Sequence, residues 1–182
     1  TVDCGTTGEA AIEAANKAGA EVIVIDHHQA DEALPPALAV INPNRQDDLS
    51  GQAHLAAAVV VFLFLIALPR VLRRRGFYAN RPEPDLLGLL DLVALATVCD
   101  VVPLRGLNRA FVAQGLKVLR FRQNAGLRAL TDAARLDEAP SRYSLGFILG
   151  PRINAGGRVG ASDLGARLLA CDDDIEARII AG

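Results

Sequence analysis

The sequence predicts an α/β protein in which a parallel-sheet domain is followed by a helical extension. One observation is the run Val22–Ile25, a short β-branched stretch typical of a strand buried on both faces of a parallel sheet. Another is the helical pattern that prevails after Asn108. With 182 residues, 51% of them hydrophobic and 22% charged, the chain has a globular composition and enough length for a core.

The first part of the chain predicts a β-α-β unit. Thr6 and Glu9 have the spacing of a capping box, which predicts a helix from there to about Ala18, ended by Gly19. Strands are expected at residues 1–3, 21–25 and 38–41. Because crossover connections are right-handed, the first two strands should be parallel, with their carboxyl ends at one edge of the sheet.

The most apolar segment is Leu55–Leu68. At 14 residues it is shorter than the ~20 that span a bilayer, so a buried helix is favoured over a membrane span. Ser50 is interpreted as its N-cap, where a helix N-terminus would also suit a phosphate oxygen. An arginine cluster completes the helix at residues 70 and 73–75, where cations complement the helix dipole.

Helices are expected over most of the remaining chain, at residues 85–95, 108–119, 127–134, 162–170 and 173–180. They are interrupted by residues 150–160, which hold four glycines, a proline and two arginines. Such a backbone can approach a ligand closely while the arginines meet phosphate, which we favour over a flexible linker.

Polar residues in three segments of the chain indicate a metal site. Asp26, His27 and His28 directly follow a buried strand, at the edge where open α/β sheets bind ligands. Asp3 ends the preceding strand, and Asp100 follows another apolar run. Imidazole and carboxylate together suit Mn, Zn or Fe rather than Ca.

Composition limits the partners and the compartment. The net charge of −2 argues against a generally basic coat for nucleic acid, although a local cationic groove remains possible. Aromatic residues make up only 4% of the chain and Trp is absent, so no large stacking platform for bases is indicated. Three cysteines without a paired spacing fit a reducing cytosol.

With these residues in place, the chain resembles the DHH phosphoesterase family, and within it the RecJ exonucleases, which are specific for single-stranded DNA. Val2–Gly5 is similar to the family's second motif, Asp26–His28 to the motif that names the family, and Cys99–Pro103 to the fourth. Gly150–Arg158 is similar to the glycine- and arginine-rich segment of RecJ. The resemblance implies a cytoplasmic 5′ to 3′ exonuclease of DNA repair and recombination, without membrane association.

The resemblance also implies roles for the site residues. Asp3 would bridge two divalent ions, Mn²⁺ or Mg²⁺, and His27 and Asp100 would complete the coordination of one of them. His28 would face the scissile phosphate, while Asp26 would orient the two histidines.

Further residues would hold the substrate. The phosphates of the strand, including the terminal 5′ group, would contact Arg152, Asn154 and Arg158, with Ser50 as a further candidate. The expected division is a DHH core at residues 1–105 and a helical extension at residues 106–182, with the substrate segment at residues 150–160.

The chain departs from the family pattern at both ends. The Asp-rich first motif should precede residue 1, and the chain contains no Met and begins in what reads as a strand end, so we expect missing upstream sequence. The family's C-terminal domain would follow Gly182. We therefore expect the chain alone to bind metal weakly, with at most one ordered ion, and to have little activity.

The sequence disfavours three alternative functions. A DHH enzyme for small substrates, such as oligoribonucleotides or pyrophosphate, is disfavoured by residues 150–160. A non-catalytic repair or replication scaffold is disfavoured because Asp3, His27, His28 and Asp100 are all present. A dinucleotide-binding domain is set aside because the turn after residue 3 lacks the glycine fingerprint.

Overall fold

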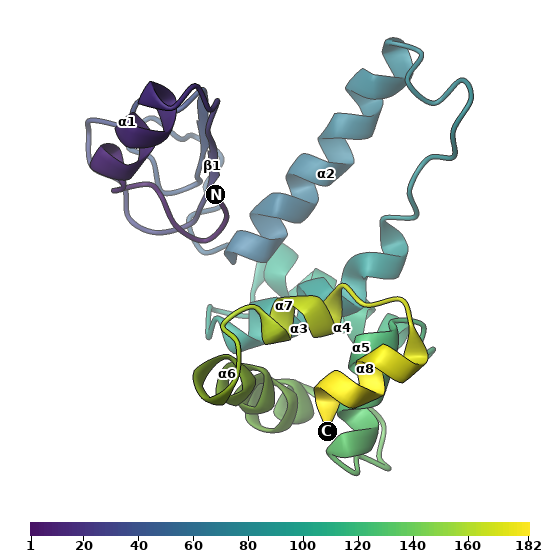
Figure 1. Cartoon of the computed structure of the whole chain (residues 1–182). Helices are drawn as coiled ribbons and strands as arrows, with labels where there is room; N and C mark the ends of the chain where they lie inside the picture. Colours follow the sequence, from purple (N-terminus) through teal and green to yellow (C-terminus); the bar gives the residue numbers. More distant parts are fainter. The chain divides into compact units, whose positions relative to one another are not determined.

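The computed structural model describes residues 1–182, with only the backbone described at Val159. The chain divides into two compact units, Thr1–Pro84 and Asp85–Gly182 (Figure 1). The division expected between residues 105 and 106 stays a prediction.

The first unit is built on a small parallel sheet. Strand β1 (Ile23–Ile25) pairs in parallel with β2 (Ala39–Ile41), so that Val24 lies opposite Val40. Val2 forms a further parallel bridge with Ile25. Helix α1 (Glu9–Lys17) packs Ile12 against Val24 and Val40. The predicted α/β class and β-α-β unit are confirmed, although the strands are shorter than expected.

Thr6 does not cap α1, contrary to the prediction. The helix begins at Glu9 after Gly8, which makes no side-chain cap. Thr6 is instead buried: its backbone N–H donates to Asp26 Oδ2 at 3.0 Å, and its hydroxyl accepts from Asn42 Nδ2 at 2.8 Å. The buried carboxylate needs donors, and this tertiary demand outweighs the local capping preference.

The predicted apolar helix is present as α2 (Ala57–Arg74), but it begins later than expected. Its N-cap is Ala56, so the assignment of Ser50 as N-cap is wrong. Ser50 lies in the preceding loop and donates its hydroxyl to Asp48 Oδ1 at 2.5 Å. Arg73 and Arg74 occupy the last turn, as predicted. Among the residues that the structure describes, no helix is both long and apolar enough to cross a membrane.

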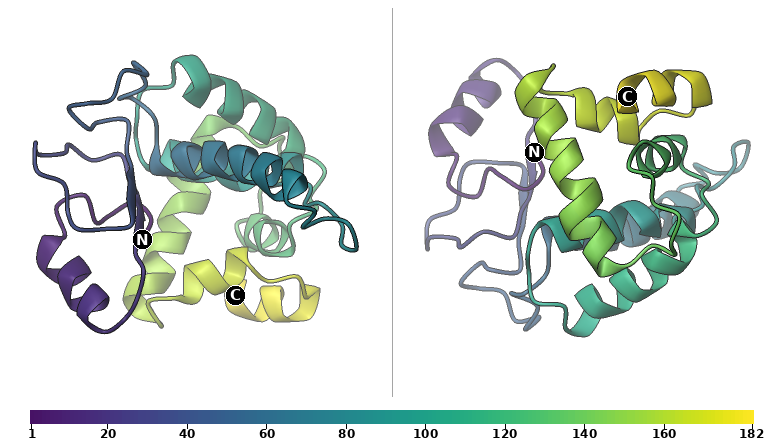
Figure 2. Two further views of the ribbon diagram at one scale, coloured as in Figure 1. Left: turned by 90° about the horizontal axis from the view of Figure 1, so that it is seen from above. Right: turned by 90° about the horizontal axis from the view of Figure 1, so that it is seen from below.

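The second unit is helical. Its elements are η1 (Leu87–Leu89), α3 (Leu90–Cys99), α4 (Gly106–Leu119), α5 (Ala125–Ala133), η2 (Ser144–Leu149), α6 (Gly150–Val159), α7 (Leu164–Leu169) and α8 (Asp174–Ala181). They share a core that includes Leu95, Val112, Leu127, Leu145 and Leu149. Helices α3 and α4 pack against each other, as do α5 and α8 (Figure 2).

Residues 150–160 do not form the open loop expected from their glycines. Gly150–Val159 is the α-helix α6, and it continues directly from η2, which is a π-helix. Pro151 lacks an N–H group, so it cannot donate to the preceding turn, and a widened π-helical turn is a recognised way to accommodate such a break. The segment therefore presents helical faces rather than bare backbone.

Close packing of α3 on α4 gives a stability prediction at Gly115. A Cβ added there would clash with the carbonyl oxygen of Leu90 and the Cβ of Ala94. We expect Gly115→Ala to lower the free energy of unfolding by about 1–3 kcal/mol, measured by urea denaturation.

Gly157→Ala is the matched control, because an added Cβ in α6 would meet its nearest atom, Ser162 O, at an ordinary 3.6 Å. Its stability should be unchanged or higher by up to about 1 kcal/mol. Equal destabilisation by both substitutions would contradict the packing argument.

Candidate metal centre

The site is organised by the buried carboxylate of Asp26, at the carboxyl end of β1. Its side chain is only 1% exposed. Oδ2 accepts from the backbone N–H of Thr6, and Oδ1 accepts from the backbone N–H of His27 at 2.8 Å and of His28 at 3.3 Å. Oδ1 also lies 2.8 Å from His28 Nδ1. These donors replace the water that the carboxylate loses on burial.

Asp26 is held in its ionised form. Burial by itself raises the pKa of the Asp26 carboxyl, but the hydrogen bonds from Thr6, His28 and His27 outweigh it and leave the pKa well below the usual value. The resulting negative charge favours a proton on His28 Nδ1, which turns the opposite nitrogen, Nε2, away from Asp26.

His27 is oriented by a different acceptor. Its Nδ1 lies 3.0 Å from the carbonyl oxygen of Leu55, in the loop before α2. A carbonyl only accepts hydrogen bonds, so Nδ1 carries the proton and Nε2 is the nitrogen able to bind a metal. That Nε2 lies 3.2 Å from Asp3 Oδ1, with the imidazole 12% exposed and the carboxylate 58% exposed.

Asp3 reaches this position through a left-handed backbone. Its φ is 59°, while its N–H donates to the carbonyl oxygen of Ile25 at 3.0 Å. Asp tolerates this conformation better than most residues. One ligand atom each from Asp3, His27 and His28 lies within 4.8 Å of the others, which is the spacing of a shared metal ion. The structure thus brings together three of the predicted residues.

Two asparagines that were not predicted as site residues fix the histidine backbone. Asn42 donates to the carbonyl oxygen of His28 at 2.9 Å, and Asn44 donates to that of His27 at 2.6 Å. Asn44 also binds the carbonyl oxygen of Ala53. Both follow β2, so their position at the carboxyl end of a neighbouring strand was the signal that could have identified them.

Asp100 belongs to the second unit, where it is the C-cap of α3. The next residue, Val101, has a φ of 59° and is 87% exposed. A β-branched residue in this region is strained, and such strain concentrates at functional positions. This supports a function for Asp100, whose place in the metal site remains a prediction.

The predicted substrate residues lie on two different elements. Arg152, Asn154 and Arg158 are exposed on α6, and Ser50 is exposed in the loop before α2. The Arg152 guanidinium donates to the carbonyl oxygen of Ile148 at 2.9 Å. Their predicted contacts with phosphate stay predictions.

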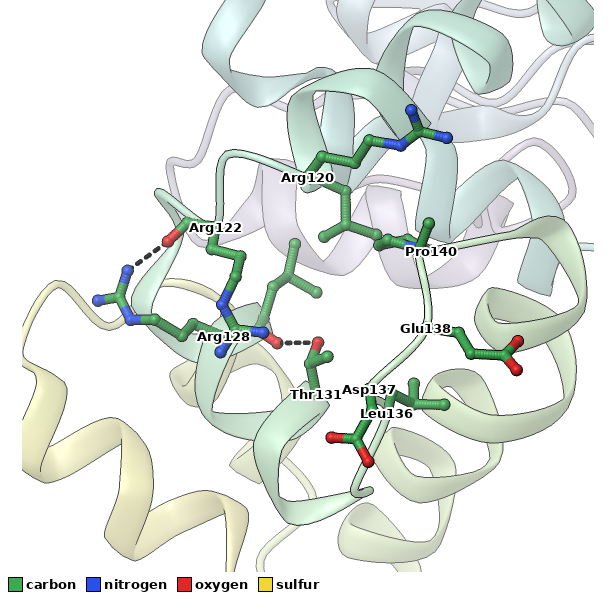
Figure 3. Close-up of a pocket in the computed structure, with 11 residues that line it drawn as sticks. Arg120, Arg122, Arg128, Thr131, Leu136, Asp137, Glu138 and Pro140 are labelled. Atoms are coloured by element: carbon green, nitrogen blue, oxygen red, sulfur yellow. Dashed lines mark hydrogen bonds between the residues drawn. The ribbon is translucent and has the colours of Figure 1, made fainter.

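A pocket of about 220 Å³ in the second unit also has arginines in its wall (Figure 3). Two of its three arginines already have partners: Arg122 pairs with Asp132, and Arg128 pairs with Asp174 and with the carbonyl oxygen of Arg122. Asp137 and Glu138 add negative charge to the wall. The pocket is therefore a weaker anion site than the exposed arginines of α6.

The sequence profile of the DHH family, N-terminal domain, matches residues 1–97. The chain belongs to the DHH family. The matched residues contain Asp3 and Asp26–His28, so the side chains that converge at the sheet edge lie within the family domain.

Similar proteins share the name RecJ. The whole chain is 44% identical to the single-stranded-DNA-specific exonuclease RecJ of Dickeya dadantii and 43% identical to that of Escherichia coli, covering 32% of each. A crystal structure of exonuclease RecJ bound to manganese matches all of the chain and 44% of its own length, with a TM-score of 0.80 and 37% identity. RecJ from Thermus thermophilus in complex with Mn²⁺ gives 0.81 and 38%, covering 26% of that chain.

These similarities support the fold and the resemblance to RecJ within the DHH family. The predicted α/β class agrees with the RecJ structures. The chain spans about a third of the length of the curated relatives it matches.

Replacing the buried carboxylate should weaken both the fold and the metal site. Asp26→Asn keeps the size of the side chain but turns an amide NH₂ toward N–H donors. We expect the free energy of unfolding to fall by about 2–4 kcal/mol and Mn²⁺ affinity to fall about 10- to 100-fold, measured by urea denaturation and calorimetric titration. Asp31→Asn, at an exposed carboxylate of the same unit, should change neither quantity.

Stability should also depend on pH through Asp26. Because its pKa is lower in the folded chain than in the unfolded chain, the ionised carboxylate stabilises the fold above about pH 4. Its contribution should decline as the pH falls below that value. Urea denaturation between about pH 3 and 6 should show a steeper loss for the natural chain than for Asp26→Asn, and parallel curves would contradict the assignment.

Proposed function

We propose that this chain forms part of a divalent-metal-dependent 5′ to 3′ exonuclease that hydrolyses the phosphodiester bonds of single-stranded DNA. The observation that carries the proposal is the convergence of Asp3, His27 and His28 at the edge of the sheet. The similarity to single-stranded-DNA-specific RecJ exonucleases over the whole chain supports the substrate.

The donor set fits Mn²⁺ or Mg²⁺, with Mn²⁺ favoured by the imidazole. Asp3, His27 and Asp100 would hold the metal, and the Leu55 carbonyl keeps the His27 Nε2 directed toward it. When bound, a pair of such ions activates a water and neutralises charge on the departing oxygen. Manganese in two RecJ structures supports the choice of ion.

The protein's own residues would position the strand. His28, held through Nδ1 by Asp26, would direct Nε2 to the scissile phosphate. Guanidinium groups suit phosphate oxygens because their donors match the oxygen spacing. Phosphates along the strand, including the terminal 5′ group, would contact Arg152, Asn154, Arg158 and Ser50.

The proposal also includes a cytoplasmic location and a role in repair and recombination. Cys4, Cys99 and Cys171 are all free thiols, as a reducing compartment allows. The role in repair and recombination is proposed from the substrate, because such an enzyme would remove single-stranded ends.

The test uses the full-length protein with end-labelled single-stranded DNA, duplex DNA and dinucleotides in Mn²⁺. We expect single-stranded DNA to be the best substrate, degraded from its 5′ end, with activity abolished by chelation. His27→Gln and Asp100→Asn should each lower the rate at least about 100-fold, since ligands matter no less than their supporting residues.

Asp31→Asn is the control and should retain full activity. Faster hydrolysis of dinucleotides than of single-stranded DNA would indicate a small-substrate enzyme instead. Full activity of both ligand variants, or activity in excess chelator, would contradict the proposed metal site.

A further inference from the structure

Two aromatic rings lie stacked on the surface of the second unit. Tyr143 and Phe147 have ring centroids 5.1 Å apart and an interplanar angle of 24°. Their residues are 66% and 71% exposed. Stacked rings in water leave an outer face open to a further flat group, and every nucleobase offers such a face.

The helix that carries the rings explains why they point outward. Its other side is anchored in the core by Ser144, Leu145 and Leu149, which are 6%, 0% and 1% exposed. Tyr143 directly precedes the π-helix η2, and Phe147 lies within it. π-Helical turns are rare and frequently occur at functional sites.

The rings belong to a longer exposed stripe. Exposed positions recur every three or four residues at Tyr143, Phe147, Pro151, Asn154 and Arg158. Because η2 runs directly into α6, the stripe follows one helix over a length on the order of 20 Å. It is aromatic at its beginning and carries a cation at its end.

The charge of this segment suits a polyanion. Residues 141–161 include Arg142, Arg152 and Arg158 and have no Asp or Glu in the sequence. All three arginines are exposed. Arg152 uses Nη1 for the Ile148 carbonyl, and a guanidinium has five N–H donors in all.

We propose that Tyr143 and Phe147 are a stacking site for bases of single-stranded DNA, continuous with the phosphate contacts on α6. This inference rests on the proposed function and adds base contacts to it. Stacking on aromatic rings beside a cationic track is how single strands are bound without sequence preference. It also provides a physical basis for preferring single strands, because paired bases in a duplex cannot lie on protein rings.

Among the side chains that the structure describes, the other exposed rings lack this combination. Phe77 packs edge-to-face with Tyr78 and lies under the Arg81 guanidinium, 4.2 Å from its ring centroid. Phe121 is 73% exposed, close to the exposure of Phe147, and serves as a matched control. Sparse aromatics argued against a large stacking platform, and the structure offers a small one of two rings.

The test measures binding, without hydrolysis, by the full-length protein in chelator. Fluorescence anisotropy compares a labelled oligo-dT with an abasic strand of equal length, which keeps the phosphates and lacks the bases. The variants are Phe147→Leu, Phe147→Trp, Tyr143→Leu and Arg158→Gln, with Phe121→Leu as control. Urea denaturation of each variant reports on folding.

We expect Phe147→Leu and Tyr143→Leu each to weaken oligo-dT binding about five- to ten-fold and to leave abasic binding unchanged. Phe147→Trp should retain the preference for bases. Arg158→Gln should weaken both ligands and lower the salt slope by about 0.7. Phe121→Leu should match the natural protein.

Two outcomes would overturn the inference alone. In one, the natural protein binds and cleaves single-stranded DNA, but Phe147→Leu prefers oligo-dT over the abasic strand as strongly as before. In the other, Phe147→Leu is destabilised without any change in this preference, which would mean that the ring packs against protein. A natural protein that neither binds nor cleaves single-stranded DNA would instead refute the proposed function.

Discussion

The buried carboxylate of Asp26 is the constraint on which the first unit depends. An ionised group that is 1% exposed is stable only when its oxygens are fully hydrogen-bonded. Thr6, His27 and His28 supply the donors. These hydrogen bonds hold together the turn before α1, the end of β1 and the His28 imidazole. Displacing any of them would leave the buried carboxylate without one of its hydrogen-bond partners.

Around this anchor, the two histidines are positioned by groups from elsewhere in the unit. The Leu55 carbonyl, from the loop before α2, orients His27. Asn42 and Asn44, which follow β2, hold the carbonyl oxygens of His28 and His27. These contacts fix the geometry of the candidate ligands, so a metal bound there would have less to order.

The second unit contributes a different kind of surface. Its core secures a long helix whose outer side carries arginines and two stacked rings. Asp100 and the strained Val101 lie at the end of α3. In the proposed function, some of these residues hold metal and others hold the strand.

The sequence by itself determined the α/β class, the parallel β-α-β unit and the family, because buried strand runs and the Asp-His-His motif are local patterns. It also identified Asp3, His27 and His28, which the structure brings together. It misassigned Thr6 and Ser50 as helix caps and residues 150–160 as a loop. Only the tertiary structure decided the conformation of these three segments and the contacts of Asn42 and Asn44. A buried charge takes its hydrogen-bond donors from distant segments, and the core residues of η2 fix the face that the helix exposes. Neither effect is visible in local spacing.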